Sequence, residues 1–164
     1  MNDPIVYTPK QSQFLAVPDA PLSYWLAQSV LDLMDCSDTV SSSADLVMGL
    51  STADNDRFTR CFWETPEDER WIPFVKGGGY CKWRGLEWLV VDWEYAGARI
   101  KAYPKSAVRN ESFYFRNGLT YTMAARGSLG VRLLDRGRIF EAKSPGVFMK
   151  PADEGLEFRA AGCG

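Results

Sequence analysis

The sequence contains no histidine, and only four cysteines among its 164 residues. Nucleophilic sites of the Ser-His-Asp and Cys-His types need an imidazole to accept a proton, so both are excluded. Cys36, Cys61, Cys81 and Cys163 are widely scattered and include no C-x-x-C pair. A structural zinc site or a disulfide framework is therefore not expected.

Long hydrophobic runs are lacking too. Stretches such as residues 86–91 are far shorter than the roughly 20 apolar residues of a membrane-spanning helix. The N-terminal residues lack the basic and apolar regions of a secretory signal peptide. These absences predict a cytoplasmic protein with no membrane partner.

Basic residues are scarce in the first third of the chain. Residues 1–56 hold one base, Lys10, against eight acids, whereas residues 57–143 hold sixteen Lys and Arg against ten Asp and Glu. The net charge of -2 conceals this asymmetry. A chain that is acidic overall can still present a basic face of the kind that a phosphate backbone requires, although an ordinary surface of mixed sign is the alternative.

Apolar periodicity divides the chain into three parts. Residues 1–20 show no sustained period and are expected to be an entry segment or linker. Apolar side chains then recur at helical spacing from Pro21 to Met34, which predicts an amphipathic helix. Residues 21–150 are expected to form one domain, followed by a tail or truncated continuation at 151–164.

From Leu46 onward, short apolar runs are separated by Gly, Asn, Asp and Pro, which is typical of strands and turns. Asn117-Gly118 predicts a hairpin, because this pair supplies the positive φ angles of a type I′ turn. Arg136-Gly137 predicts a second turn, and residues 95–107 a short helix. The expected strands are 46–50, 58–63, 71–75, 87–92, 112–115, 119–122, 131–134 and 139–141. The fold class is therefore expected to be α+β, with an N-terminal helix packed on a twisted, mostly antiparallel β-sheet.

A glycine-rich segment, Lys76-Gly77-Gly78-Gly79-Tyr80, is the strongest candidate binding loop. It matches neither a P-loop nor a dinucleotide-binding loop, because Cys81-Lys82-Trp83-Arg84-Gly85 follows it. Mobile backbone flanked by bases and flat rings suits a nucleic-acid backbone or base edge. A plain hairpin loop with incidental charges is the alternative.

A second polar cluster runs from Gly49 to Phe58. Its Asp and Asn side chains can bond neighbouring amides and form a self-capped turn. The functional alternative is a loop that fits against DNA, with Arg57 and Arg60 as phosphate contacts. Asp92 and Glu94 are interpreted as exposed strand-edge residues, not as a catalytic pair. The aromatic residues Trp25, Trp71, Trp88, Phe113 and Phe115 are assigned mainly to the core.

Taken in order, these segments closely resemble PglX-type adenine-specific DNA methyltransferases of BREX phage-defence systems, and related single-chain restriction-modification methyltransferases. The resemblance covers residues 14–150. It is carried by residues 20–25, 49–58, 71–85, 90–94 and 109–121, and continues to Phe140. In that family this region is assigned to target recognition, so the resemblance implies a domain that reads a DNA sequence.

The motifs that carry out methylation in this family are missing. Adenine amino-methylation uses an Asn/Asp-Pro-Pro-Tyr/Phe motif, and no Pro-Pro pair occurs in the sequence. We therefore expect no catalytic residue, no metal and no cofactor in this chain, although S-adenosylmethionine serves the parent family. An excised domain, a natural fragment and a split-gene product all fit.

The resemblance and the two clusters together predict double-stranded DNA as the partner, with a methyltransferase core or another defence-system subunit as a further one. A protein-interaction module or decoy that docks such a subunit in trans is the alternative. The predicted DNA-binding residues are Ser51, Thr52, Asn55, Arg57, Arg60, Lys76, Gly77, Gly78, Gly79, Tyr80, Lys82, Trp83, Arg84, Arg109, Arg116 and Arg126.

Overall fold

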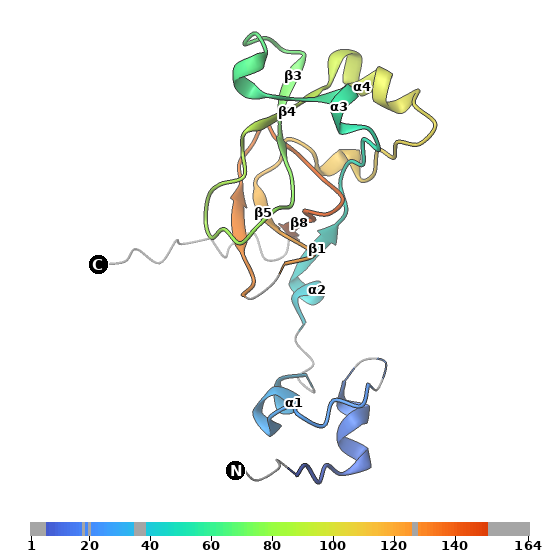
Figure 1. The fold of residues 1–164 in the computed structure, drawn as a ribbon, viewed down its shortest axis with the longest axis vertical. Coiled ribbons are helices and arrows are strands. Elements are labelled where there is room, and N and C mark those ends of the chain that lie inside the picture. The colour runs from blue at the N-terminus through green and yellow to red at the C-terminus, as the bar shows by residue number, and fades with distance from the viewer. Residues whose placement is uncertain (1–5, 18, 20, 35–38, 126–127, 151–164) are drawn as a thin grey trace, which may run out of the picture. The chain divides into compact units, whose positions relative to one another are not determined.

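The computed structural model describes residues 6–17, 19, 21–34, 39–125 and 128–150. It divides the chain into two compact units, Met1–Ser42 and Ser43–Gly164. The elements of both are shown in Figure 1. Each unit is described by itself.

The first unit holds a 3-10 helix, η1 (Gln11–Ala16), and an α-helix, α1 (Gln28–Met34). The Gln13 amide donates a hydrogen bond of 2.9 Å to the Gln28 side chain, which links the two helices. The helix predicted from Pro21 begins seven residues later, because Ser23 N–H bonds Pro21 O and Leu26 N–H bonds Ser23 O, so this segment forms turns. A short helix, α2 (Val40–Ser43), spans the boundary between the units.

The described residues of the second unit form two four-stranded sheets. The first has the order β1 (Ala44–Val47), β8 (Gly146–Met149), β5 (Gly118–Tyr121) and β6 (Val131–Leu134), all antiparallel. The second has the order β2 (Thr59–Cys61), β4 (Leu89–Asp92), β3 (Trp71–Val75) and β7 (Ile139–Phe140), with only β3 and β7 parallel. The remaining helices are α3 (Asn55–Phe58), η2 (Phe62–Glu64), α4 (Glu94–Lys101) and η3 (Glu111–Phe113). The expected α+β class is confirmed, whereas the packing of the N-terminal helix on a sheet stays a prediction.

Aromatic residues from both sheets and from the segments between them form one core. Phe140 of β7 is fully buried, with its ring centroid 5.5 Å from that of Tyr114 and 5.6 Å from that of Phe148 on β8. Phe58 and Phe74 are buried in the same cluster. The assignment of Trp25, Trp88 and Phe115 to the core is wrong, since 59%, 46% and 41% of their surfaces are exposed.

The predicted hairpin at Asn117-Gly118 is not formed. Residues 111–113 form η3 in place of a strand, and Phe115 takes a left-handed φ of 63° while its N–H bonds Arg138 O. The Asn117 side chain accepts a 2.9 Å hydrogen bond from Arg136 N–H. The chain thus enters β5 from a turn, and β5 pairs with β6 and β8. The second predicted turn is present, with Gly137 at a φ of 82°, but it joins strands of different sheets.

Candidate nucleic-acid interface

A pocket of about 350 Å³ brings the two predicted clusters together. Asn55, at the start of α3, comes from the polar cluster of residues 49–58, and Lys76, Gly77 and Gly78, directly after β3, come from the glycine-rich segment. These four residues were predicted as DNA contacts. The pocket is completed by Thr122, Ala124, Glu141 and Lys143.

The wall of this pocket is set by the parallel pairing of β3 with β7. Glu141 follows β7, and its N–H bonds Val75 O, so its carboxylate lies beside the end of β3. The ammonium of Lys76 lies 2.9 Å from that carboxylate. The charge of Lys76 is therefore already paired.

Gly77 also lies in this wall. A Cβ on Gly77 would come within 2.8 Å of Lys143 O, so glycine is needed for this close approach.

A buried arginine lies behind the pocket. Arg132 on β6 is 1% exposed, and its guanidinium donates to Thr122 Oγ1 at 3.1 Å, to Ser144 Oγ at 2.9 Å and to Lys76 O at 3.4 Å. None of the ion pairs found among the described residues includes Arg132, and its Nε–H has no acceptor there. Burial lowers the pKa of Arg132, but a guanidinium stays charged in proteins. The interior therefore carries a positive charge held only by neutral acceptors.

The loop after the glycines lies along β6. Trp83 N–H bonds Val131 O and Leu133 N–H bonds Trp83 O, each at 2.9 Å, while the Trp83 ring is 68% exposed. Tyr80 is exposed as well, and the Lys82 ammonium lies 6.0 Å from the centre of its ring. This loop, residues 79–84, thus presents two rings and a lysine to solvent.

Arg84 of the same loop is less free than the sequence indicated. Its guanidinium lies 2.9 Å from the carboxylate of Asp135, which also binds Arg138 at 3.1 Å. The hydrogen bond from Arg84, which outweighs the opposing effect of burial, and the further one from Arg138 lower the pKa of Asp135. Arg84 can reach a phosphate only by exchanging this partner.

The polar cluster of residues 49–58 forms a self-capped turn, as one of its two interpretations predicted. Asp54 accepts a hydrogen bond of 3.1 Å from Arg57 N–H at the start of α3. Thr52 Oγ1 donates to Asn55 Oδ1 at 2.7 Å, and Ser51 pairs through its backbone with Ala107. The turn therefore fixes the side chain of Asn55 at the rim of the pocket.

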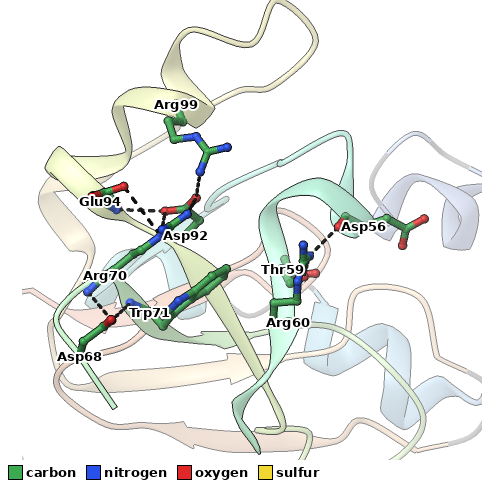
Figure 2. A network of polar contacts seen from close by, with 9 residues as sticks. All are labelled: Asp56, Thr59, Arg60, Asp68, Arg70, Trp71, Asp92, Glu94 and Arg99. Atoms are coloured by element: carbon green, nitrogen blue, oxygen red, sulfur yellow. Dashed lines mark hydrogen bonds and ion pairs between the residues drawn. The ribbon is translucent and has the colours of Figure 1, made fainter. Parts of the chain in front are cut away.

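Most of the predicted arginines are occupied by the fold. Arg57 lies over the Tyr103 ring, 5.3 Å from its centre, and Arg116 lies over Phe113 at 5.0 Å. Arg60 donates to the carbonyls of Asp56 and Thr59, as Figure 2 shows. Arg109 is exposed, and Arg126 lies outside the described residues.

Figure 2 also shows a buried carboxylate, Asp92, between Arg70 and Arg99. Asp92 is 2% exposed, contacts both nitrogens of the Arg70 fork at 3.1 and 2.9 Å, and accepts from Arg99 at 2.7 Å. Its expected place at an exposed strand edge is wrong, because β4 lies between β2 and β3. Burial opposes its ionisation, but the hydrogen bonds and charges of the two arginines prevail and lower the pKa of Asp92. This network closes the β4–α4 corner and contacts no pocket residue.

The pocket residues missed by sequence reasoning are Thr122, Glu141 and Lys143, with Arg132 behind them. Glu141 and Lys143 follow a short apolar strand at alternating positions, which was the one available signal. Within the described ranges there is no group of acids and cysteines that could hold a metal ion. None of the helices described there has the length and apolar character that a membrane span requires.

Comparison with known proteins relates the chain to DNA methyltransferases. No family model matches it. It is 27% identical over 165 residues to the adenine-specific methyltransferase PglX of Lacticaseibacillus casei (strain Zhang), covering 87% of this chain and 14% of that protein. It is 26% identical over 154 residues to the adenine-specific methyltransferase BrxX of Escherichia coli O9:H4 (strain HS), covering 88% of this chain and 12% of that protein. The chain is thus similar to a small segment of these curated relatives, which confirms the methyltransferase side of the resemblance.

Proposed function

We propose that the second unit binds duplex DNA as the target-recognition region of an adenine-specific methyltransferase. In this proposal, methyl transfer from S-adenosylmethionine belongs to other parts of such a protein. The observation that carries the proposal is the meeting of the two predicted clusters at one pocket, beside a loop that exposes Tyr80, Lys82 and Trp83. The similarity to segments of two adenine-specific methyltransferases supports the choice of DNA.

The chemistry of the exposed groups suits DNA. Lys82 and Lys143 take part in none of the ion pairs found in the described part of the chain, so their charges are available to phosphates. The exposed rings of Tyr80 and Trp83 offer flat apolar faces next to Lys82. Phosphate contacts position a protein on the duplex, and side chains at base edges select the sequence. The glycine loop and its neighbours combine both kinds of group.

This function predicts a binding affinity that falls steeply with salt. Each phosphate contact contributes about -0.9 to the slope of log affinity against log salt concentration, so replacing Lys82 by alanine should make the slope shallower by about one. The measurement is fluorescence anisotropy of a labelled random-sequence duplex, titrated with the full chain at several salt concentrations. Circular dichroism of the variant should match that of the wild type.

Lys105→Ala is the matched control for this titration. Lys105 is exposed in the turn after α4 and makes no ion pair among the residues described. Figure 1 shows that the segment between β3 and β4 extends toward β5 and β6, away from the α4 end of the unit. We expect the Lys105 variant to keep the wild-type slope. A Lys82→Ala variant that also keeps the wild-type slope would contradict the proposed interface.

A second candidate function is docking of another methyltransferase segment or subunit. It is favoured by an exposed aromatic cluster of Phe62, Trp63 and Trp88, at the end of β2, an outer strand of its sheet. Exposed aromatic residues are enriched at the centres of protein interfaces. Replacing Trp63 by alanine separates the two functions, because it should weaken docking to a co-expressed methyltransferase core and leave duplex binding unchanged.

A further inference from the structure

We propose that the pocket beside the ends of β3 and β7 binds a phosphate group. The inference rests on the proposed function for the source of that phosphate, a DNA backbone, but not for the pocket itself. The pocket volume of about 350 Å³ is several times the space that one water molecule occupies, so a phosphate with part of its sugar fits.

The hydroxyl of Thr122 is the first reason. Its oxygen has two lone pairs, which accept hydrogen bonds from the Arg132 guanidinium at 3.1 Å and from Gly78 N–H at 3.4 Å. The hydroxyl can therefore act only as a donor toward a further group. No acceptor for it is found among the described residues, and Thr122 lines the pocket. A ligand at this position must accept hydrogen bonds.

Asn55 offers a second donor. Its side-chain oxygen accepts from Thr52 Oγ1 at 2.7 Å, and Thr52 is buried, so the orientation of the amide is fixed. The NH₂ group of Asn55 then remains as its hydrogen-bonding atom for a ligand. Thr122 and Asn55 thus provide donors from two segments that are far apart in the sequence.

The charges around the pocket favour an anion. Glu141, which would repel one, is neutralised by Lys76 at 2.9 Å. Lys143 is exposed and belongs to no ion pair in the described part of the chain. Arg132, which donates a hydrogen bond to Thr122, contributes a buried charge that has no carboxylate partner among the described residues. Two positive charges therefore remain uncompensated here. A phosphate accepts hydrogen bonds through all its oxygens and supplies the missing negative charge.

The test is a nuclear magnetic resonance titration of the full chain with inorganic phosphate, against sodium chloride at equal ionic strength. We expect saturable shifts of the backbone amide signals of Gly77, Gly78 and Thr122. Lys143→Gln should weaken this binding about tenfold, because it removes one charge-assisted contact. Lys105→Gln, an exposed lysine outside the pocket, should leave it unchanged.

Two Thr122 variants distinguish the loss of the hydroxyl hydrogen-bond donor from a loss of folding. Thr122→Val removes the hydroxyl and should abolish the shifts, whereas Thr122→Ser keeps the hydroxyl and should retain them. If the valine variant does not fold, the serine and Lys143 variants still decide the matter. Absence of localised shifts in the wild type, or identical binding by Lys143→Gln, would overturn the proposal.

Competition identifies the source of the phosphate. Duplex DNA should displace inorganic phosphate from the wild-type pocket, and Lys143→Gln should reduce duplex affinity. Pocket binding of phosphate without any duplex binding would support the pocket, assign it to a free phosphate compound and refute the proposed function. Duplex binding that is unaffected by Lys143→Gln, together with no phosphate shifts, would refute the pocket and leave the proposed function standing.

Discussion

Replacing Phe140 by alanine is expected to lower the free energy of unfolding of the second unit by about 3–5 kcal/mol. Phe140 is fully buried, and its ring packs against Tyr114 and Phe148. The alanine variant loses the transfer free energy of the ring and leaves a cavity that close-packed neighbours fill only in part. Urea unfolding followed by tryptophan fluorescence measures this loss.

Phe62→Ala is the control for this variant. The Phe62 ring is 57% exposed, so its removal should change the free energy of unfolding by no more than about 0.5 kcal/mol. Equal losses for the two phenylalanines would show that the core does not lie around Phe140.

Replacing Asp92 by asparagine should lower the free energy of unfolding by about 2–4 kcal/mol, because it leaves two arginines facing each other without their carboxylate. The carboxylate is 2% exposed, while Arg70 and Arg99 are partly in water, which keeps the loss at the lower end for a buried ion pair. The control is Glu94→Gln, since Glu94 lies 3.8 Å from Arg70 and is 36% exposed. Its loss should be below about 1 kcal/mol, as for surface ion pairs.

The difference in stability between the wild type and Asp92→Asn should also depend on pH. The pKa of Asp92 is lower in the folded chain than in the unfolded one, because the arginines outweigh the effect of burial. Its contribution to stability is therefore complete above the unfolded pKa of about 3.9 and is lost as the pH falls through the folded value. Wild type and Asp92→Asn should differ at neutral pH and converge in acid. A difference that stays constant down to that range would contradict the role given to the Asp92 carboxylate.

Local sequence was a good guide where one strand is bounded by its own turn residues. Residues 71–75 and 131–134 form β3 and β6 with the predicted bounds. Local sequence fails to predict the structure of residues 113–118, because hydrogen bonds to residues far along the chain determine their conformation. Arg138 O binds Phe115 N–H and Asn117 binds Arg136, so the strong Asn-Gly signal is overridden.

Some residues of the candidate site were likewise predictable from local sequence, and others were not. The glycine loop and Asn55 were recognisable from residue type, because glycines and small polar residues mark exposed turns. Their meeting at one pocket depends on the pairing of β3 with β7, which no local pattern encodes. Arg132 could not be found either, since a lone arginine in an apolar strand gives no sign that it is buried and without a carboxylate partner.

Hydrogen–deuterium exchange of the full chain, with and without duplex DNA at low salt, is the most direct test of DNA binding by the pocket and the loop of residues 79–84. We expect slower exchange in residues 76–84 and 141–143 when DNA is present, and little change in α4 (Glu94–Lys101). No protection at any DNA concentration, or protection confined to segments outside the pocket and the loop of residues 79–84, would contradict this proposal.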